Sequence, residues 1–140
     1  MKLLTKIASI FFLFFFSYTS FAYYVLSSPT GYINDEAQLL TAEQKQNLEI
    51  KLEEFEKNTS NEIAIVTIES LEGDSIENFA IKLFEDYKIG KEGKDNGVLI
   101  LKSKNDRSVR IEIGYGLEGA LTDSDSFSII NKIIIPQFKE

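Results

Sequence analysis

Apolar residues recur at helical spacing early in the chain and predict one long helix there. Thr41 and Gln44 form a capping box, in which each residue satisfies a backbone N–H of the other, so we expect the helix to begin at about Ala42. The polar segment 58–61 ends this pattern. The apolar stripe of this helix consists of Leu48, Leu52 and Phe55.

Two more helices are expected further along. Asp74 with Glu77 gives a second capping signal, and a wide apolar stripe follows until Gly90 closes that helix. A third helix is expected from about residue 124 to residue 135, because Pro136 cannot continue it. The core residues expected from the two helices are Phe79, Leu83, Phe84 and Ile133.

Three strands are expected between and after these helices. Residues 62–68 and 98–101 are continuously apolar, which is typical of strands covered on both faces. Residues 108–113 alternate between apolar and charged, so this strand is expected to be half exposed and to form an antiparallel hairpin with its predecessor. The order of elements predicts an α/β fold, a small mixed sheet with helices on both faces.

The first 22 residues are predicted to be a leader rather than part of the fold. Lys2 and Lys6 precede an apolar run from Ile7 to Phe16, and small residues at Ser20 and Ala22 form a site of the kind that signal peptidase cleaves. An uncleaved membrane anchor is the alternative, although the run is only about half of the roughly 20 residues that span a bilayer. We therefore expect an exported protein, on the periplasmic or extracellular side of the cytoplasmic membrane, with residues 23–31 as an exposed lead-in.

Composition narrows the chemistry of this chain. The net charge of −7 becomes −9 without the leader, since 13 basic and 22 acidic residues remain, and such a surface repels nucleic acid and anionic lipid. There is no Cys and no His, which excludes Ser-His-Asp and Cys-His catalysis and zinc sites built on those residues. The remaining candidate ligands are oxygen atoms of side chains and backbone carbonyls, which bind hard cations such as Ca²⁺ and Mg²⁺.

Three glycines, Gly114, Gly116 and Gly119, have the G-x-G-x-x-G spacing of a dinucleotide-binding loop. That interpretation fails in context, because the preceding strand is the second arm of a hairpin and the next helix begins only after Thr122. Glu118 lies inside the motif and would repel a pyrophosphate. A loop that binds a cation is the better interpretation.

The predicted hairpin gathers polar residues at one end of the sheet. Asp95 and Asn96 precede its first strand, and Glu118 and Asp123 follow its second, so all four are expected at the same end. Asp106 lies in the hairpin turn at the other end. Each acidic residue also has an ordinary explanation: a turn for Asp95, a solvated surface position for Glu118 and a helix cap for Asp123.

Several segments together resemble the TPM domain family over residues 32–140, namely "YINDEAQLL", "DNGVLIL" and "GYGLEGALTD". The resemblance implies a three-layer α/β/α sandwich, and the family includes reported phosphatases and calcium-binding proteins without clear activity. Family members usually continue beyond the position of Phe138, many with a transmembrane segment, so a membrane anchor is possible in that missing region. The acidic cleft implied by the resemblance falls on Asp35, Asp95, Glu118 and Asp123.

Three functions follow from these observations. The first is a binding module that holds Ca²⁺, or Mg²⁺, in the acidic cleft and acts in assembly or repair through a protein partner in the cell envelope. The second is a metal-assisted phosphatase for phosphate monoesters, with Asp95 and Asp123 as candidate catalytic residues. The third is a scaffold whose acidic residues only cap and solubilise. The oligomeric state stays open.

Overall fold

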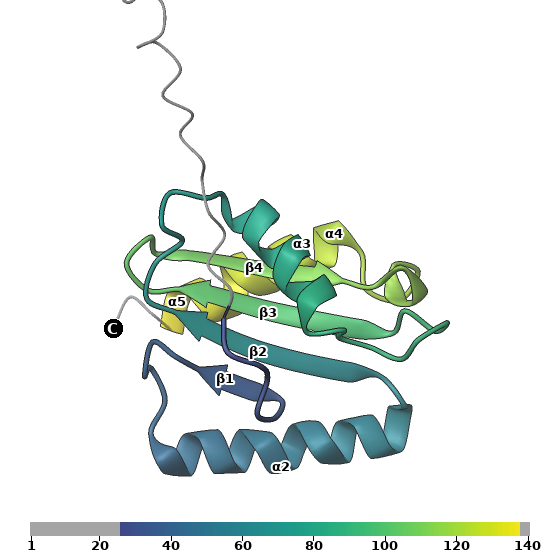
Figure 1. Ribbon diagram of the computed structural model, residues 1–140. Helices are drawn as coiled ribbons and strands as arrows, with labels where there is room; N and C mark the ends of the chain where they lie inside the picture. The colour runs from purple at the N-terminus through teal and green to yellow at the C-terminus, as the bar shows by residue number, and fades with distance from the viewer. Residues whose placement is uncertain (1–25, 138–140) are drawn as a thin grey trace, which may run out of the picture.

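A computed structural model describes residues 26–137 of the 140-residue chain, so the predicted leader lies outside the described residues. A four-stranded mixed sheet carries helices on both faces, which confirms the α/β prediction (Figure 1). The strands are β1 (Ile33–Asp35), β2 (Glu62–Ile68), β3 (Gly97–Ser103) and β4 (Ser108–Ile113). The helices are α2 (Ala42–Thr59), α3 (Ile76–Asp86), the 3₁₀ turn η1 (Tyr115–Leu117), α4 (Asp123–Ile129), the π-helical η2 (Ile130–Ile134) and α5 (Ile135–Gln137).

The sheet has the strand order β1-β2-β3-β4, with three parallel strands and one antiparallel edge strand. The predicted hairpin is confirmed, since β3 pairs with β4 from Val98–Ile113 to Ser103–Ser108. β1 was not expected from the sequence, because three residues are too few to show a strand period.

One face of the sheet carries the main core. Ala64, Val66, Leu99 and Leu101 point to that face and are fully or almost fully buried against α3, which lies across the sheet in Figure 1. Phe79 and Leu83 of α3 are fully buried there, as predicted. The lead-in contributes as well, because Leu26 is only 6% exposed and belongs to this core, whereas the sequence had suggested an exposed segment.

The opposite face is covered less completely. α4 and α5 lie behind the sheet and α2 runs along its β1 side (Figure 1). No residue of α2 is buried, and Phe55 faces only a small apolar hollow that it shares with Ile63 of β2 and Val98 of β3. Phe55 is 38% exposed, and Ile133 is 61% exposed, so the expectation that Ile133 belongs to the core is wrong.

Helix ends follow local chemistry, with two corrections. The Thr41–Gln44 capping box starts α2 as predicted. α3 is capped by Ser75 rather than by Asp74, and it ends at Asp86, before Gly90. The third helix does not stop at Pro136. Its backbone changes to π-helical pairing over Ile130–Ile134, and the helical path continues through the proline, whose ring and missing N–H do not fit a regular α-helix.

Candidate functional site: an acidic hollow at the open edge of β4

Two of the four predicted site residues line one hollow beside the edge strand β4. Glu118 and Asp123 lie on its wall together with Leu121 and Thr122, and the four consecutive residues 110–113 of β4 form its other side. The hollow measures about 420 Å³, and its surface is mostly polar. The connection from β4 to α4 therefore brings Glu118 and Asp123 to a shared space, but Asp95 and Asn96, which the hairpin argument placed with them, do not line it.

The glycines of this connection make a close packing contact with the loop before β3. A Cβ atom on Gly114 would lie 2.2 Å from the Asp95 carbonyl oxygen, and one on Gly116 would lie 2.0 Å from the Lys94 carbonyl oxygen. Both distances are far shorter than any tolerable contact with rigid backbone. Gly119 has no atom within 4 Å of such a Cβ. The glycine pattern therefore serves backbone-to-backbone packing, and the helix begins outside it, at Asp123.

Asp95 takes part in this packing and does not line the hollow. Its backbone is left-handed, with φ of 47°, and its carbonyl oxygen accepts a 2.9 Å hydrogen bond from the Gly116 N–H. The neighbouring Asn96 is buried, and its side-chain amide donates to the Ser60 carbonyl at 2.5 Å while its Oδ1 accepts from the Lys91 N–H. Asp95 and Asn96 thus hold the loop, and the ordinary turn explanation accounts for their contacts.

Asp35 lies at the opposite end of the sheet from Asp95. β1 is parallel to β2 and pairs Asp35 with Thr67, whereas the Asp95 loop meets β2 at Glu62. Five residues of extended strand separate the two levels, which is about 16 Å. The structure therefore does not bring Asp35 together with the other three residues of the set that the resemblance implied.

The carboxylate of Asp35 has a structural role where it lies. It accepts hydrogen bonds from the N–H groups of Leu39 and Leu40, at 3.0 and 2.9 Å, and from the Thr67 hydroxyl. Partial burial acts to raise its pKa, but the hydrogen bonds from Thr67, Leu40 and Leu39 outweigh burial and hold the pKa below its usual value. This carboxylate shapes the turn that leads into α2.

In the first turn of α4, the residues of the capping box are Thr122 and Asp125, whereas the acidic residue on the wall of the hollow is Asp123. Thr122 is the N-cap, and its hydroxyl accepts from the Asp125 N–H while the Asp125 carboxylate accepts from the Thr122 N–H at 3.0 Å. The hydrogen bond from the Thr122 hydroxyl is the main reason that the pKa of Asp125 is lowered. Asp123 is therefore not the cap, which removes the ordinary explanation offered for it.

Two further charges in the hollow come from β4 itself. Arg110 donates from Nε and from a terminal nitrogen to one carboxylate oxygen of Glu112, at 3.1 and 3.0 Å. The alternation in residues 108–113 placed these two side chains on one face, but the sequence did not connect them to the site. With one positive and three negative side chains, the hollow has a formal charge of −2.

The carboxylates of Glu118 and Asp123 make no hydrogen bond and no ion pair with any residue of the described range 26–137. Within that same range there is also no group of three or more acidic side chains close enough to enclose a metal ion. Protein carboxylates would thus supply at most part of a coordination shell here, and water would supply the rest.

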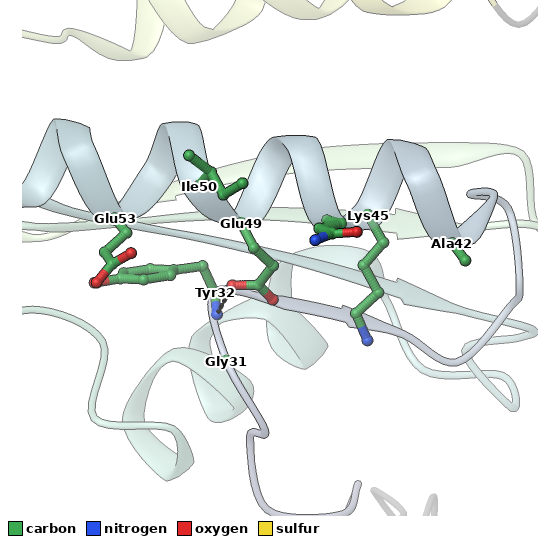
Figure 2. A pocket seen from close by; sticks show the side chains of 8 residues that line it. Gly31, Tyr32, Ala42, Lys45, Glu49, Ile50 and Glu53 are labelled. Atoms are coloured by element: carbon green, nitrogen blue, oxygen red, sulfur yellow. Dashed lines mark hydrogen bonds between the residues drawn. The ribbon is translucent and has the colours of Figure 1, made fainter.

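A second hollow, of about 520 Å³, lies beside α2, and its wall includes Glu49 and Tyr32, which attach β1 to that helix (Figure 2). The two carboxylate oxygens of Glu49 accept from the N–H groups of Tyr32 and Ile33, at 3.0 and 2.9 Å, and so hold β1 beside the helix. The Tyr32 hydroxyl donates to Glu56 at 2.5 Å, and this bond, aided by burial, raises the Tyr32 pKa to about 12. These groups explain the attachment of β1 to α2.

Comparisons with known proteins give a consistent result. A family model of the TPM domain matches residues 33–140. The N-terminal domain of a protein from P. gingivalis is 35% identical, with a TM-score of 0.73, over 79% of this chain and 70% of that one. The N-terminal domain of the cg2496 protein from Corynebacterium glutamicum shares the fold at 17% identity, with a TM-score of 0.61, over 83% and 76% of the two chains.

No curated protein matches the sequence. Among the described residues, no helix combines the length and the apolar character that crossing a membrane requires.

Proposed function

Because the chain belongs to the TPM-domain family, we propose that it is an exported binding module that holds Ca²⁺ in the hollow beside β4 and acts through a protein partner in the cell envelope. The observation that carries this proposal is the presence of two uncommitted carboxylates, Glu118 and Asp123, on the wall of one polar hollow. Through that partner, the module would act in assembly or repair of the cell envelope.

The chemistry of the hollow favours a hard cation. The charged groups that could bind a metal here are carboxylates, and the chain has no His or Cys to attract softer metals. Ca²⁺ accepts irregular oxygen ligands and water, whereas Mg²⁺, the alternative, requires a near-ideal octahedron. With two carboxylates and water as ligands, we expect a loose site with a Kd of about 10⁻⁴ to 10⁻³ M, the range of extracellular calcium modules.

A metal-assisted phosphatase is less well supported by the same geometry. Such an enzyme needs a positive group for the phosphoryl oxygens, and the only guanidinium among the residues lining this hollow, that of Arg110, is bound to Glu112. The formal charge of −2 also repels a phosphate dianion. The two candidate catalytic residues, Asp95 and Asp123, do not share the hollow.

Calcium titration calorimetry of the wild-type protein and of a Glu118→Gln/Asp123→Asn double variant tests the proposal. We expect binding in the wild type, at least about tenfold weaker binding in the variant, and a melting temperature that rises with Ca²⁺ only in the wild type. The matched control is Glu54→Gln/Glu77→Gln, which changes the charge equally at exposed helix positions and should bind as the wild type does.

Two results would overturn the proposal. One is the absence of both binding heat and thermal stabilisation at about 10 mM Ca²⁺, ten times the weakest expected Kd. The other is cation-dependent hydrolysis of para-nitrophenyl phosphate that Asp123→Asn abolishes, which would establish the enzyme instead.

A further inference from the structure

The outer edge of β4 carries backbone groups that no other strand pairs. The Gly114 N–H donates to the Gly97 carbonyl at 2.8 Å, so these two residues form a hydrogen-bonded pair of the β3–β4 ladder. In an antiparallel ladder such pairs alternate, so Glu112 and Arg110 also direct their N–H and C=O groups towards β3. Val109, Ile111 and Ile113 must then direct theirs away from the sheet.

The pairing of β3 with β2 supports this assignment. The Glu62 N–H donates to the Asn96 carbonyl, so the even-numbered residues of β3 bond to β2 and the odd-numbered ones are left for β4. Within the described part of the chain, the backbone groups of Ile111 and Ile113 have no hydrogen bond to a turn, cap or side chain. They form a free strand edge, and the acidic hollow runs along it, because its lining includes residues 110–113 without a gap.

We propose that β4 binds an extended, basic peptide segment of a partner protein as a fifth strand of the sheet. Strand addition supplies main-chain hydrogen bonds through Ile111 and Ile113, while side chains of the peptide reach the wall of the hollow. The volume of about 420 Å³ falls within the usual range of ligand sites, about 300–1,000 Å³. This proposal rests on the proposed role as a binding module and names its partner.

Charge selects a basic segment as the occupant. Across the edge, the peptide meets the uncommitted carboxylates of Glu118 and Asp123, and Lys or Arg side chains at alternate positions would pair with them. A second copy of this chain would bring its own acidic wall against the first, and the two chains carry −7 each, so edge-to-edge pairing of copies is disfavoured. The edge also lacks proline and an outward lysine, two common devices that block strand addition.

Amide hydrogen exchange of the isotope-labelled protein, measured by NMR, tests strand addition residue by residue. The probe is the acetylated and amidated hexapeptide Lys-Val-Lys-Thr-Lys-Val, at saturating concentration and low salt. We expect protection of the Ile111 and Ile113 amides to rise at least about tenfold, because these amides gain partners. The Arg110 and Glu112 amides already bond to β3 and should change little. The same peptide N-methylated at alternate residues should give no protection.

Charge reversal tests the choice of partner. In a Glu118→Lys/Asp123→Lys variant, the preference should pass from the lysine peptide to a Glu-Val-Glu-Thr-Glu-Val peptide, with about a tenfold change in relative affinity. The control variant Glu54→Lys/Glu77→Lys should keep the lysine preference, and a urea melt of each variant confirms folding.

Three outcomes would overturn the inference: no change at Ile111 and Ile113, equal binding of both peptides by the wild type, or protection that grows with protein concentration alone, which would indicate pairing of two copies. All measurements are made in chelator, so they do not depend on the calcium site. Peptide binding without calcium binding would leave this inference standing and refute the cation part of the proposed function.

Discussion

Replacing Asp35 by alanine decides whether that residue shapes a turn or belongs to a cation site. In the structure its carboxylate accepts two backbone N–H groups, from Leu39 and Leu40, and the hydroxyl of Thr67, which is itself buried. Asp35→Ala removes all three acceptor interactions at once. The Thr67 hydroxyl also accepts from the Ala37 N–H, so the change loosens the whole segment between β1 and α2.

The expected cost follows from these contacts. A hydrogen bond to a charged group contributes about 1.5–3 kcal/mol when its partner is buried and much less when water can replace it. Asp35, Leu39 and Leu40 are all half-buried, so we expect a total of about 3 kcal/mol, below the sum for three buried bonds. For a domain of this size that lowers the melting temperature by about 10–15 °C. Asp35→Asn keeps one acceptor oxygen and should cost about half as much.

The pH dependence provides a second test. Because the folded pKa of Asp35 is lowered, its ionised form stabilises the fold fully above the unfolded pKa of about 3.9, and this contribution disappears as the pH falls through the folded pKa. The difference in unfolding free energy between the wild type and Asp35→Asn should therefore be constant from pH 7 to pH 5 and shrink below pH 4.

Urea unfolding at several pH values, followed by circular dichroism, measures both quantities, with the exposed Asp86→Ala as control. The turn assignment fails if Asp35→Ala unfolds like the wild type. It also fails if the variant is as stable as the wild type in chelator but loses calcium binding, since Asp35 would then be a ligand.

Two other changes test the glycine packing beside the site and the hairpin turn at the other end of the sheet. Gly116→Ala should cost about 1–3 kcal/mol, because the new methyl group would strike the Lys94 carbonyl, whereas Gly119→Ala meets no atom and should be neutral; thermal melts compare the two, and equal stability would contradict the packing role. Asp106→Ala should cost about 1–3 kcal/mol in the same assay, because the buried Ser103 hydroxyl and the Leu71 N–H lose their acceptor, and an unchanged melting temperature would contradict this.

Elements with local signals were predictable from the sequence. The Thr41–Gln44 capping box fixed the start of α2, and the short polar turn between two apolar runs predicted the β3–β4 hairpin. The hairpin in turn predicted that the Asp95 loop would meet the segment after β4, as the Gly116–Asp95 backbone hydrogen bond shows, although only Glu118 and Asp123 line the hollow. These inferences hold because the relevant contacts lie within a few residues or within one strand pair.

Elements that depend on distant partners were not predictable. β1 has three residues, and its attachment depends on Glu49 of α2, whose carboxylate accepts from the Ile33 amide of β1 and from the Tyr32 amide just before it, 16 and 17 residues away. The exposure of Phe55 and Ile133 depends on what covers the second face of the sheet, and helical period alone cannot show that. Asp35 entered the site by resemblance, without the strand register that places it at the other end.

The alternating pattern of β4 determines the direction of its backbone amides as well as the direction of its side chains. Alternation in residues 108–113 shows which side chains share a face of the sheet, but the same alternation also sets which amides face β3 and which face outward. Arg110 and Glu112 are bonded to β3 and neutralise each other, while Ile111 and Ile113 carry the free amides and bury their side chains wholly or in part. Affinity along this edge must therefore come from backbone pairing, and selectivity must come from Glu118 and Asp123 across the hollow. If this division is correct, neutralising Glu118 and Asp123 will weaken the preference for a basic peptide, but the peptide will still add as a strand.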